Sequence, residues 1–427
     1  MKDQEKLPEF WEKKPLGQVA VRITKGATPT TYGYKFYESG IIFIKIENVN
    51  DGFVDVKTIK DYISFEAHEF QKRSQLEEND LLFSIAGTIG ETCIIRKEYL
   101  PANTNQAFAI IRGAQSQIIP EFLAFQLNAF VQRIKYKARG GAMNNISIGD
   151  LNGIPIIIPP LKDQHPIVEK INKLFSELDA ARWQLETVKK QIDLYKQAVF
   201  KSAFEGGLSK NKIAEYENCS AWKITKIADV GEIVSGGTPS TKEPEYWDGD
   251  IPWITPADLS GYSNKYIDKG RRSITSKGLS KSSARIIPSG SVLLSSRAPI
   301  GYVAIAKNEL CTNQGFKSII PSSRVTSEYL YYFLKAHTQK IIERASGTTF
   351  KEVSLRTISS LEIIIPPIKQ QKIIVAEIEH RFSFCDKMEE TIFDNIQRSE
   401  ILKQSILKQA FEGKLVKPQT NQQINCK

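Results

Sequence analysis

The residues best able to do chemistry in this chain are turn hydroxyls and loop amides that occur twice. GATPT at 26–30 and GGTPS at 236–240 each combine Gly, Thr and Pro in a turn, and TNQ occurs at 104–106 and again at 312–314. Backbone N–H groups and hydroxyls of such turns can bind phosphate oxygens, and an Asn or Gln amide can pair with the edge of adenine. The same groups can also close a connection between strands or satisfy loop backbone, so both interpretations stay open.

Basic side chains are the second feature that fits an anionic partner. Lys and Arg outnumber Asp and Glu by 58 to 48, which gives a formal net charge of +10. A single basic run, such as KYKARGG at 135–141, is equally typical of a solvated helix end, but these bases are spread over both halves of the chain. The hypothetical DNA-contacting set is Lys25, Thr28, Thr30, Lys35, Asn105, Gln106, Lys135, Lys137, Arg139, Thr238, Ser240, Arg271, Arg272, Lys277, Lys281, Arg285, Arg297, Asn313 and Gln314.

Motifs for catalysis and for metal binding are absent from the sequence. The chain has no GxxxxGKS/T phosphate loop, no GxGxxG after a strand, no HExxH helix, no GxSxG elbow and no Asp-Pro-Pro-Tyr or Asn-Pro-Pro-Tyr adenine-flipping motif. Its four histidines are isolated, and no two of its five cysteines have metal-ligand spacing. We therefore predict no catalytic residue and no metal site. An enzyme that cleaves or modifies nucleic acid through an unrecognised active site is the alternative.

The compartment is predicted from the cysteines and from the apolar runs. Scattered cysteines fit a reducing compartment, and the N-terminal MKDQEK has no apolar signal region. Runs such as IPIIIPP at 154–160 are far shorter than the ~20 residues that span a bilayer. We expect a soluble, cytoplasmic protein with no membrane partner.

A long internal repeat organises the elements that position these residues. The segment 156–208 returns at 363–415 without a gap, from IIIPPLKDQ and IIIPPIKQQ to KSAFEGGL and KQAFEGKL. In the first copy, apolar residues alternate spacings of four and three from Ile167 to Val199, which is typical of a helix packed on another helix. We predict an antiparallel pair that acts as a spacer; two amphipathic helices in separate cores are the alternative. The positions predicted to pack between the helices or against partner subunits are Ile171, Leu178, Leu185, Ile192, Phe204, Ile378, Met388, Ile392, Leu402 and Phe411.

The repeat also includes two blocks of about 150 residues, a size that can hold a core. Residues 11–158 resemble residues 222–365 in order, with GATP answering GGTP and TNQAF answering TNQGF. Short apolar runs with turn punctuation and one or two helices predict an α+β domain in each block. The predicted division is 1–159 and 221–366 for the blocks, 160–208 and 367–416 for the helical repeats, 209–220 for a linker and 417–427 for a tail.

This layout resembles the specificity subunit of type I restriction–modification enzymes over essentially the whole chain. The resemblance rests on blocks headed by Trp11 and Trp222, on the GxTP and TNQ-x-F motifs, and on repeats that open IIIPP-x-K-x-Q and close AFEG-x-L. It implies two target-recognition domains joined by two long antiparallel helices in an internal pseudo-two-fold repeat. It also implies that this chain does no chemistry and holds no cofactor, since S-adenosylmethionine, ATP and Mg²⁺ belong to partner subunits.

The partners implied by the resemblance are double-stranded DNA, two methyltransferase subunits and, in the full enzyme, restriction subunits. Two readers related by a pseudo-two-fold axis would meet DNA at half-sites roughly one helical turn apart. Because the blocks differ in sequence, we expect an asymmetric bipartite target. The helix ends, including Phe200, Phe204 and Phe411, either dock the partners or pack under the blocks. A fused or solitary methyltransferase partner, or a structural coiled-coil adaptor, are further alternatives.

Overall fold

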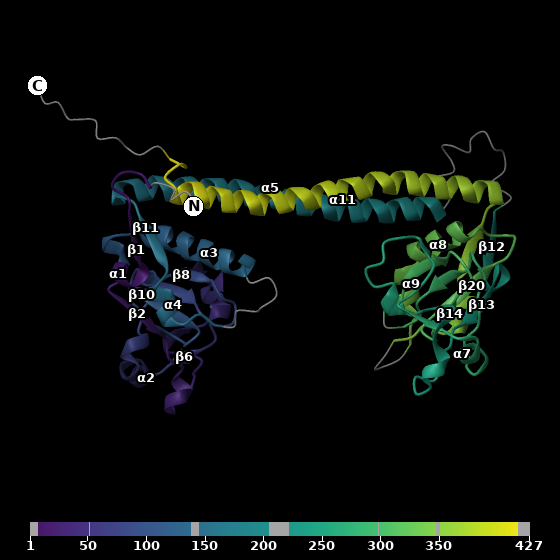
Figure 1. Ribbon diagram of the computed structural model, residues 1–427, viewed down its shortest axis with the longest axis horizontal. Helices are drawn as coiled ribbons and strands as arrows, with labels where there is room; N and C mark the ends of the chain where they lie inside the picture. The colour runs from purple at the N-terminus through teal and green to yellow at the C-terminus, as the bar shows by residue number, and fades with distance from the viewer. Residues whose placement is uncertain are drawn as a thin grey trace, which may run out of the picture. The chain divides into compact units, whose positions relative to one another are not determined.

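The computed structural model of the chain divides into two compact units. One unit comprises Met1–Leu185 with Asp394–Lys427, and the other comprises Glu186–Phe393. Each unit therefore joins one α+β block to a stretch of each of two long helices (Figure 1). The structure describes residues 7–50, 52–137, 145–204, 222–297, 299–346 and 351–416.

A four-stranded antiparallel sheet forms the centre of the first block. Its strands, in order, are β2 (Arg22–Lys25), β10 (Phe108–Arg112), β7 (Leu81–Ser84) and β8 (Thr92–Ile94). Phe83 and Ala109 pack in a core with side chains of α3 (Pro120–Lys137), whereas Leu82 and Phe108 pack in a second core. Since successive strand residues point to opposite faces, both faces are covered, and β7 and β10 are continuous apolar runs up to their last residues, Ser84 and Arg112, rather than alternating.

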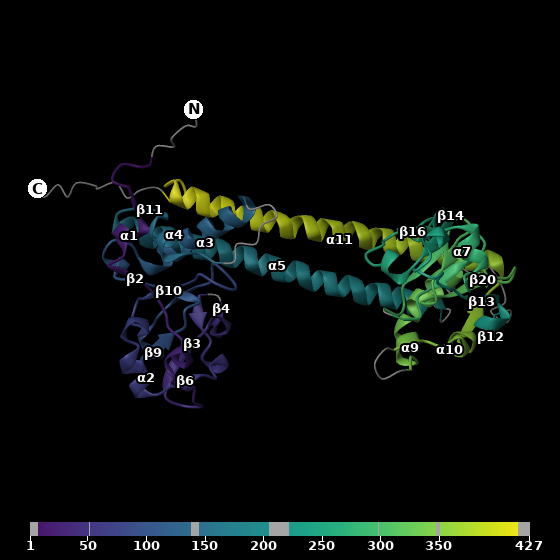
Figure 2. The ribbon, with the colours of Figure 1, turned by 60° about the horizontal axis from the view of Figure 1, so that its bottom comes forward.

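A smaller three-stranded sheet lies on the other side of this block from α3 (Figure 2). Its strands, in order, are β6 (Tyr62–Ile63), β3 (Ile41–Ile44) and β9 (Ala102–Thr104), with β3 antiparallel to β6 and parallel to β9. Helix α2 (Phe65–Phe70) follows β6 and begins where the Ser64 hydroxyl accepts a hydrogen bond from the N–H of Ala67 at 3.1 Å. The other short elements are α1 (Leu16–Val19), β4 (Val49–Asn50), β5 (Phe53–Val54) and α4 (Ile148–Asn152).

The second block repeats this strand order, which confirms the predicted α+β repeat. Strands β13 (Gly231–Ser235), β20 (Lys317–Pro321), β17 (Val292–Leu294) and β18 (Val303–Ala306) take the places of β2, β10, β7 and β8. Strands β16 (Arg272–Ile274), β14 (Trp247–Ile254) and β19 (Cys311–Thr312) take the places of β6, β3 and β9. One strand is added at the edge of the larger sheet, β15 (Tyr266–Ile267). The helices are α7 (Ser276–Ser280), α8 (Ser327–Ala336), α9 (Thr338–Glu343) and α10 (Leu355–Ser359).

A two-stranded antiparallel ribbon connects each block to a long helix. In the first block, β1 (Glu12–Pro15) pairs with β11 (Pro155–Ile158), and α5 (Leu161–Phe204) begins three residues later. In the second block, β12 (Lys223–Lys226) pairs with β21 (Glu362–Ile365), and α11 (Ile368–Phe411) follows. The Pro pair between strand and helix has no N–H to continue the ladder, so the strand ends there. In the described part of the chain, no helix combines the length and the apolarity needed to cross a bilayer.

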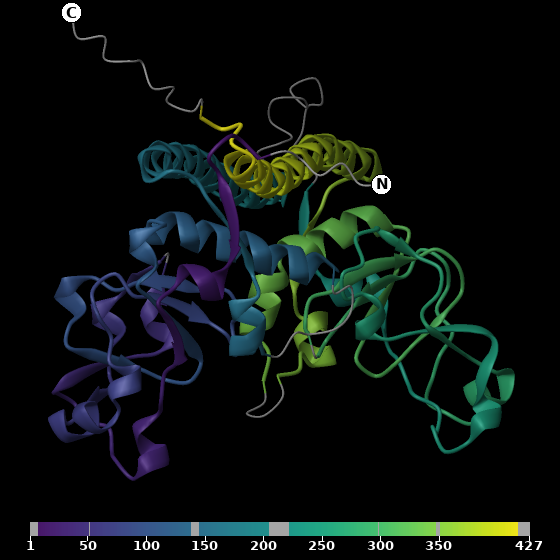
Figure 3. The same cartoon turned by 60° about the vertical axis from the view of Figure 1, so that its left-hand side comes forward.

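The two long helices run antiparallel in each unit, as the sequence predicts. In the first unit, Asp179 pairs with Lys403 at 2.5 Å and Arg182 pairs with Glu400 at 2.7 Å. In the second unit, Lys196 pairs with Glu389 at 3.0 Å. Residue numbers rise along α5 while those of the partners fall along α11 within the first unit (Figure 3).

Burial along the helices shows that two of the predicted positions do not pack between the helices. Met388 and Leu402 are exposed, at 49% and 50%. One row of the interface keeps the heptad spacing from Ile378 to Ile392 and is buried. The other row passes through Glu389 and Lys403, one residue beyond the predicted positions, because charged side chains there reach partners on α5. The predicted Ile171 and Ile192 are buried, and Leu178 and Leu185 are half-buried.

The aromatic residues at the helix ends pack inside the blocks. The rings of Phe204 and Tyr329 lie 5.3 Å apart, and those of Phe411 and Phe122 lie 5.7 Å apart. Phe204 and Phe411 are buried, and Phe200 contacts Phe382 at 4.9 Å. Of the two predicted roles, partner docking is therefore wrong for Phe204 and Phe411, because the recognition blocks already cover them. Phe200 is half-buried, and both roles stay open for it.

A buried glutamine fixes each long helix to its block. The side-chain oxygen of Gln371 accepts a hydrogen bond from the N–H of Thr326 at 2.8 Å, and its amide nitrogen donates to the carbonyl oxygens of Arg324 and Pro366. Gln164 bonds its own block in the same way, through the N–H of Ile119 and the carbonyl oxygens of Gln117 and Pro159. These bonds explain why both repeats open on a motif that ends in Gln.

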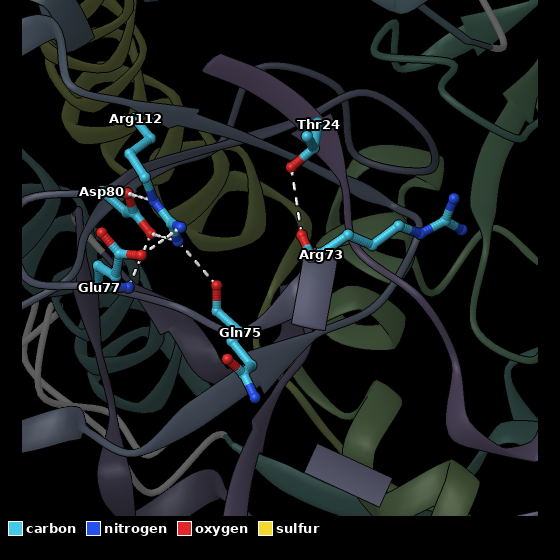
Figure 4. A network of polar contacts seen from close by, with 6 residues as sticks. All are labelled: Thr24, Arg73, Gln75, Glu77, Asp80 and Arg112. Carbon is cyan, nitrogen blue, oxygen red and sulfur yellow. Dashed lines mark hydrogen bonds and ion pairs between the residues drawn. The ribbon is translucent and has the colours of Figure 1, made fainter. Parts of the chain in front are cut away.

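The larger sheet of the first block contains a buried ion pair (Figure 4). Arg112 donates to both carboxylate oxygens of Asp80, at 2.8 and 2.6 Å, and also to Glu77 and to the carbonyl oxygen of Gln75. Burial raises the pKa of the Asp80 carboxyl, and the hydrogen bonds from Arg112 act against that rise. The second block has Ser291 and Ile320 at the two aligned positions, so the fold itself does not need this pair.

We predict that Arg112→Ile lowers the free energy of unfolding by about 3 kcal/mol, because it leaves the Asp80 carboxylate buried without its cationic partner. Asp80→Ser should cost less, since the half-buried Arg112 keeps its pair with Glu77. The double variant should be close to the wild type, since it installs the pair of residues that the second block uses. Urea unfolding of the full chain measures all three. Glu78→Ser, an exposed change in the same turn, is the control and should shift stability by less than about 0.5 kcal/mol. Additive losses in the double variant would contradict the coupling.

Candidate nucleic-acid interface

The two motifs of the first block, GATP and TNQ, meet and form one structure. The N–H of Ala27 donates to the carbonyl oxygen of Thr104 at 2.9 Å, and the hydroxyl of Thr28 donates to the side-chain oxygen of Gln106. The side chain of Asn105 accepts a hydrogen bond from the backbone two residues further on, at 3.1 Å. Asn105 therefore closes its own loop, while Thr28 and Gln106 lie together at the surface.

The second block contains the same arrangement. The N–H of Gly237 donates to the carbonyl oxygen of Thr312 at 2.9 Å, and the hydroxyl of Thr238 donates to the side-chain oxygen of Gln314. Asn313 again accepts from the backbone two residues on, at 2.9 Å. The two motifs that the sequence shows far apart are thus a single crossing of turn and loop in each block. Their predicted contact with DNA stays a prediction.

The first glycine of each turn is required by this crossing. A Cβ atom on Gly26 would lie 2.1 Å from the carbonyl oxygen of Asn105, and one on Gly236 would lie 2.2 Å from that of Asn313. These atoms belong to backbone, which cannot swing away as a flexible side chain would. Glycine at these two positions therefore lets the turn approach the loop.

In the second block, the crossing continues into a pair of tryptophans. The indole N–H of Trp253 donates to the carbonyl oxygen of Gly237 at 2.9 Å, and that of Trp247 donates to the carbonyl oxygen of Ser240 at 3.0 Å. The two rings lie 5.0 Å apart and nearly perpendicular, and Arg272 lies over the face of Trp247. The sequence analysis selected Arg272 and Ser240 but missed Trp247, which connects them.

In the first block, an exposed aromatic cluster lies beside the turn. The rings of Tyr32 and Tyr34 each lie 5.5 Å from that of Phe70. The guanidinium of Arg73 donates to the hydroxyl of Tyr32 at 3.4 Å, and the backbone of Arg73 accepts from the hydroxyl of Thr24 (Figure 4). These residues were not predicted from the sequence. Aromatic residues that interleave with bases directly after the GATP turn are the signal that could have identified them.

Several of the predicted bases already have acidic partners. Arg271 pairs with Asp258 at 3.0 Å, and burial acts to raise the pKa of that carboxyl while hydrogen bonds from Thr255 and Arg271 lower it below its usual range. Two further exposed pairs join predicted bases to acids, namely Lys277 with Glu245 at 2.6 Å and Arg285 with Glu232 at 3.3 Å. To contact DNA, these three basic side chains would have to exchange a protein carboxylate for a phosphate.

The structure describes the remaining predicted basic residues to different extents. Lys25, Lys35 and Lys281 are exposed, and within the described residues none of them forms an ion pair; Arg297 is half-buried. Lys135 and Lys137 lie in α3, but their side chains, like all of Arg139, lie outside what the structure describes. Thr30 and Ser240 are exposed at the two turns. Over the described ranges, no cluster of three or more His, Cys, Asp or Glu is arranged to hold a metal ion.

Comparison with known proteins agrees with this architecture. Residues 8–190 and 220–398 match the sequence profile of the type I restriction modification DNA specificity domain. The chain belongs to this family. DNA-sequence recognition is thereby the task of the two blocks of this type I specificity subunit, as the sequence predicts.

The similar proteins cover the chain to different extents. Over 155 residues, which are 36% of this chain and 36% of the relative, it is 54% identical to the type I restriction enzyme MjaIX specificity subunit of Methanocaldococcus jannaschii. It is 25% identical to the putative MjaX specificity subunit of the same organism, over 96% of this chain and 94% of that one. The StySPI specificity subunit of Salmonella potsdam is 24% identical, over 96% and 90%.

Two solved structures show the same fold. One, from a study of complex assembly and conformational transition of the type I R-M system, has a TM-score of 0.77 at 20% identity and covers 96% of this chain and all of that one. The other is the HsdS subunit from Thermoanaerobacter tengcongensis, with a TM-score of 0.57 at 18% identity, covering 97% and 99%. At these identities the likeness concerns the fold alone.

We predict that Gly26→Ala and Gly236→Ala each destabilise their own block by about 3 kcal/mol, the upper end of the usual cost of overpacking. The added methyl group has to displace backbone at the crossing of turn and loop. Gly149→Ala is the matched control, because a Cβ there meets only the Ser147 hydroxyl oxygen at 3.5 Å and the position is helical. Urea unfolding reports all three. If Gly26→Ala is as stable as the wild type, the turn and the loop do not pack closely enough to exclude a methyl group.

Proposed function

We propose that this chain is the non-catalytic DNA-recognition subunit of a type I methyltransferase and endonuclease complex, and that it reads an asymmetric bipartite target. The observation that carries the proposal is one scaffold used twice in a single chain. Both blocks contain the same crossing of GxTP turn and TNQ loop. The exposed groups beside that crossing differ between them.

The difference between the blocks supports two unlike half-sites. Beside its turn, the first block has exposed Tyr32 and Phe70 with Arg73. At the corresponding side, the second block has Arg272 held over Trp247. Since base edges are read by particular donors, acceptors and apolar groups, different surface groups select different bases.

We propose double-stranded DNA, two methyltransferase subunits and, in the full complex, restriction subunits as partners. Exposed apolar side chains of α5 and α11 support a docking role for the helices, since contiguous exposed apolar surface is typical of interfaces. In the second unit, a groove of about 600 Å³ between the helices is lined by Ile192, Tyr195, Phe384 and Met388 among others. The exposed apolar side chains include Trp183, Leu194, Tyr195, Phe384, Met388, Phe393, Ile401 and Leu402.

The cofactors and the compartment follow from the same proposal. S-adenosylmethionine, ATP and Mg²⁺ would be held by the partner subunits, and this chain would hold none of them. The complex would act in the cytoplasm, where it meets chromosomal DNA.

A methylation map tests this function. The chain is co-expressed with the methyltransferase subunit from its own locus in a methylation-free host, and modified adenines are read across the genome. A single split motif, methylated on both strands, is the expected result, and the methyltransferase without this chain is the control. A stable complex that adds no methylation would contradict the proposal. Cutting or methylation of DNA by the purified chain with Mg²⁺ alone would favour the alternative, a nucleic-acid enzyme.

We predict that Lys25→Gln and Lys35→Gln each reduce the salt dependence of DNA binding. Each phosphate contact contributes about 0.9 to the slope of log affinity against log salt concentration, so each variant should lower the slope by about 1. Fluorescence anisotropy of the assembled complex on its mapped target, between about 50 and 200 mM salt, measures the slope. Lys13→Gln, on the ribbon strand β1, is the matched control and should leave it unchanged. Equal slopes for all three would remove Lys25 and Lys35 from the phosphate contacts.

A further inference from the structure

Arg272 occupies a position in the second block that fixes its side chain in space. Its guanidinium carbon lies 3.6 Å from the centre of the Trp247 ring, the shortest cation–ring distance among the described residues. This is a stacking distance, so the planar guanidinium lies on the face of the indole. The residue belongs to strand β16 and faces Trp253 across the ladder with β14, so its backbone is part of a sheet rather than of a loop.

The surface under the guanidinium is itself rigid. Trp247 and Trp253 are both buried, and each indole N–H is bonded to a carbonyl oxygen of the 236–240 turn. The two rings support each other at an angle of 82°. Arg272 is therefore held at the surface by two side chains, Trp247 and Trp253, whose hydrogen bonds to the turn restrict their rotation.

The hydrogen-bond donors of Arg272 remain available. Within the described residues, its guanidinium donates no hydrogen bond and forms no ion pair. The neighbouring Arg271 and Lys277 are both paired with acids. A guanidinium has five N–H donors in one plane, and stacking on a ring leaves that plane open at its edge.

We propose that Arg272 is a specificity-determining residue, which reads guanine in the second half-site by donating two hydrogen bonds to its O6 and N7 atoms in the major groove. The inference rests on the proposed function. Arginine bonded to these two atoms is the commonest specific contact of proteins with base pairs, and it needs a guanidinium of fixed plane. A phosphate offers paired acceptors too, but it can also be bound by the point charge of a flexible lysine, for which no stacked platform is needed.

The first block has the opposite charge at this position. The strand register aligns Phe43 with Trp253, and the residue opposite Phe43 is Asp61, whose backbone oxygen accepts from the N–H of Phe43 at 3.1 Å. The Asp61 carboxylate pairs with Lys45 at 2.7 Å. At this register position the first block therefore has no arginine, and its cation over the equivalent ring is Lys45 over Phe36, which is already paired with Asp61. The effect of Arg272 should be confined to one half-site.

The test is the methylation map of complexes that contain Arg272→Lys or Arg272→Met. Lysine keeps the charge but loses the planar pair of donors, and methionine keeps Trp247 covered but loses charge and donors. We expect both variants to accept more than one base at a single guanine position of one half-site, with the other half-site unchanged. Binding to the mapped target should fall about ten- to a hundredfold for Arg272→Met. Arg356→Lys, an exposed change in α10 of the same block, is the control.

Three other outcomes would overturn the proposal. A motif that stays unchanged while affinity falls equally on all sequences, with a smaller salt slope, would make Arg272 a phosphate contact. If the motif and the affinity are unchanged and Arg272→Met only lowers the melting temperature, the role of Arg272 is to pack on Trp247. Relaxation at both half-sites would show a general loss of structure. The wild-type map decides the proposed function separately, because a split motif there stands whatever the variants do.

Discussion

The attachment of each long helix to its block depends on one buried amide. Gln164 and Gln371 are themselves fully buried, and each bonds three backbone groups that lie where a block meets its helix. The proline pair before each helix makes such a residue necessary, because it ends the strand and leaves the carbonyl of Pro159 or Pro366 to be satisfied by a side chain. The N–H groups that these glutamines accept from belong to Ile119 and Thr326, just before α3 and α8, so the amide couples the long helix to the main helix of the block.

Sequence periodicity predicted the helix pair but only one of its two contact rows. The row through Ile378 and Ile392 is apolar and was identified. The second row contains Glu389 and Lys403. The apolar pattern instead predicted the residues just before them, Met388 and Leu402. Lysine can take such a position because its stem packs while its charge reaches a carboxylate on the other helix. That partner is more than 190 positions away in the sequence, so the choice is visible only in three dimensions.

The candidate interface was predictable as motifs but not as a site. GxTP and TNQ could be found because they recur, and their recurrence indicates a shared scaffold. Their hydrogen bonds to each other, and the use of Asn105 and Asn313 inside the loop, depend on a crossing between segments 78 residues apart in the first block and 76 in the second. For the same reason, the six basic residues predicted in the second block could not be ranked from the sequence. Only the structure separates Arg271, held by Asp258, from Arg272, held on Trp247.

A protein that recognises two different half-sites with two similar blocks needs a backbone that both blocks share and surface side chains that can differ. The blocks keep the strand order and the crossing, yet they differ even inside the larger sheet. Asp80 and Arg112 of the first block correspond to Ser291 and Ile320 of the second. Replacement of a buried ion pair by smaller or apolar groups is tolerated when both partners change together. The same independence holds at the surface, where one register position carries Asp61 in one block and Arg272 in the other. Because the sheet fixes where that side chain points, a single substitution there changes the hydrogen-bonding character of one half and leaves the other half untouched.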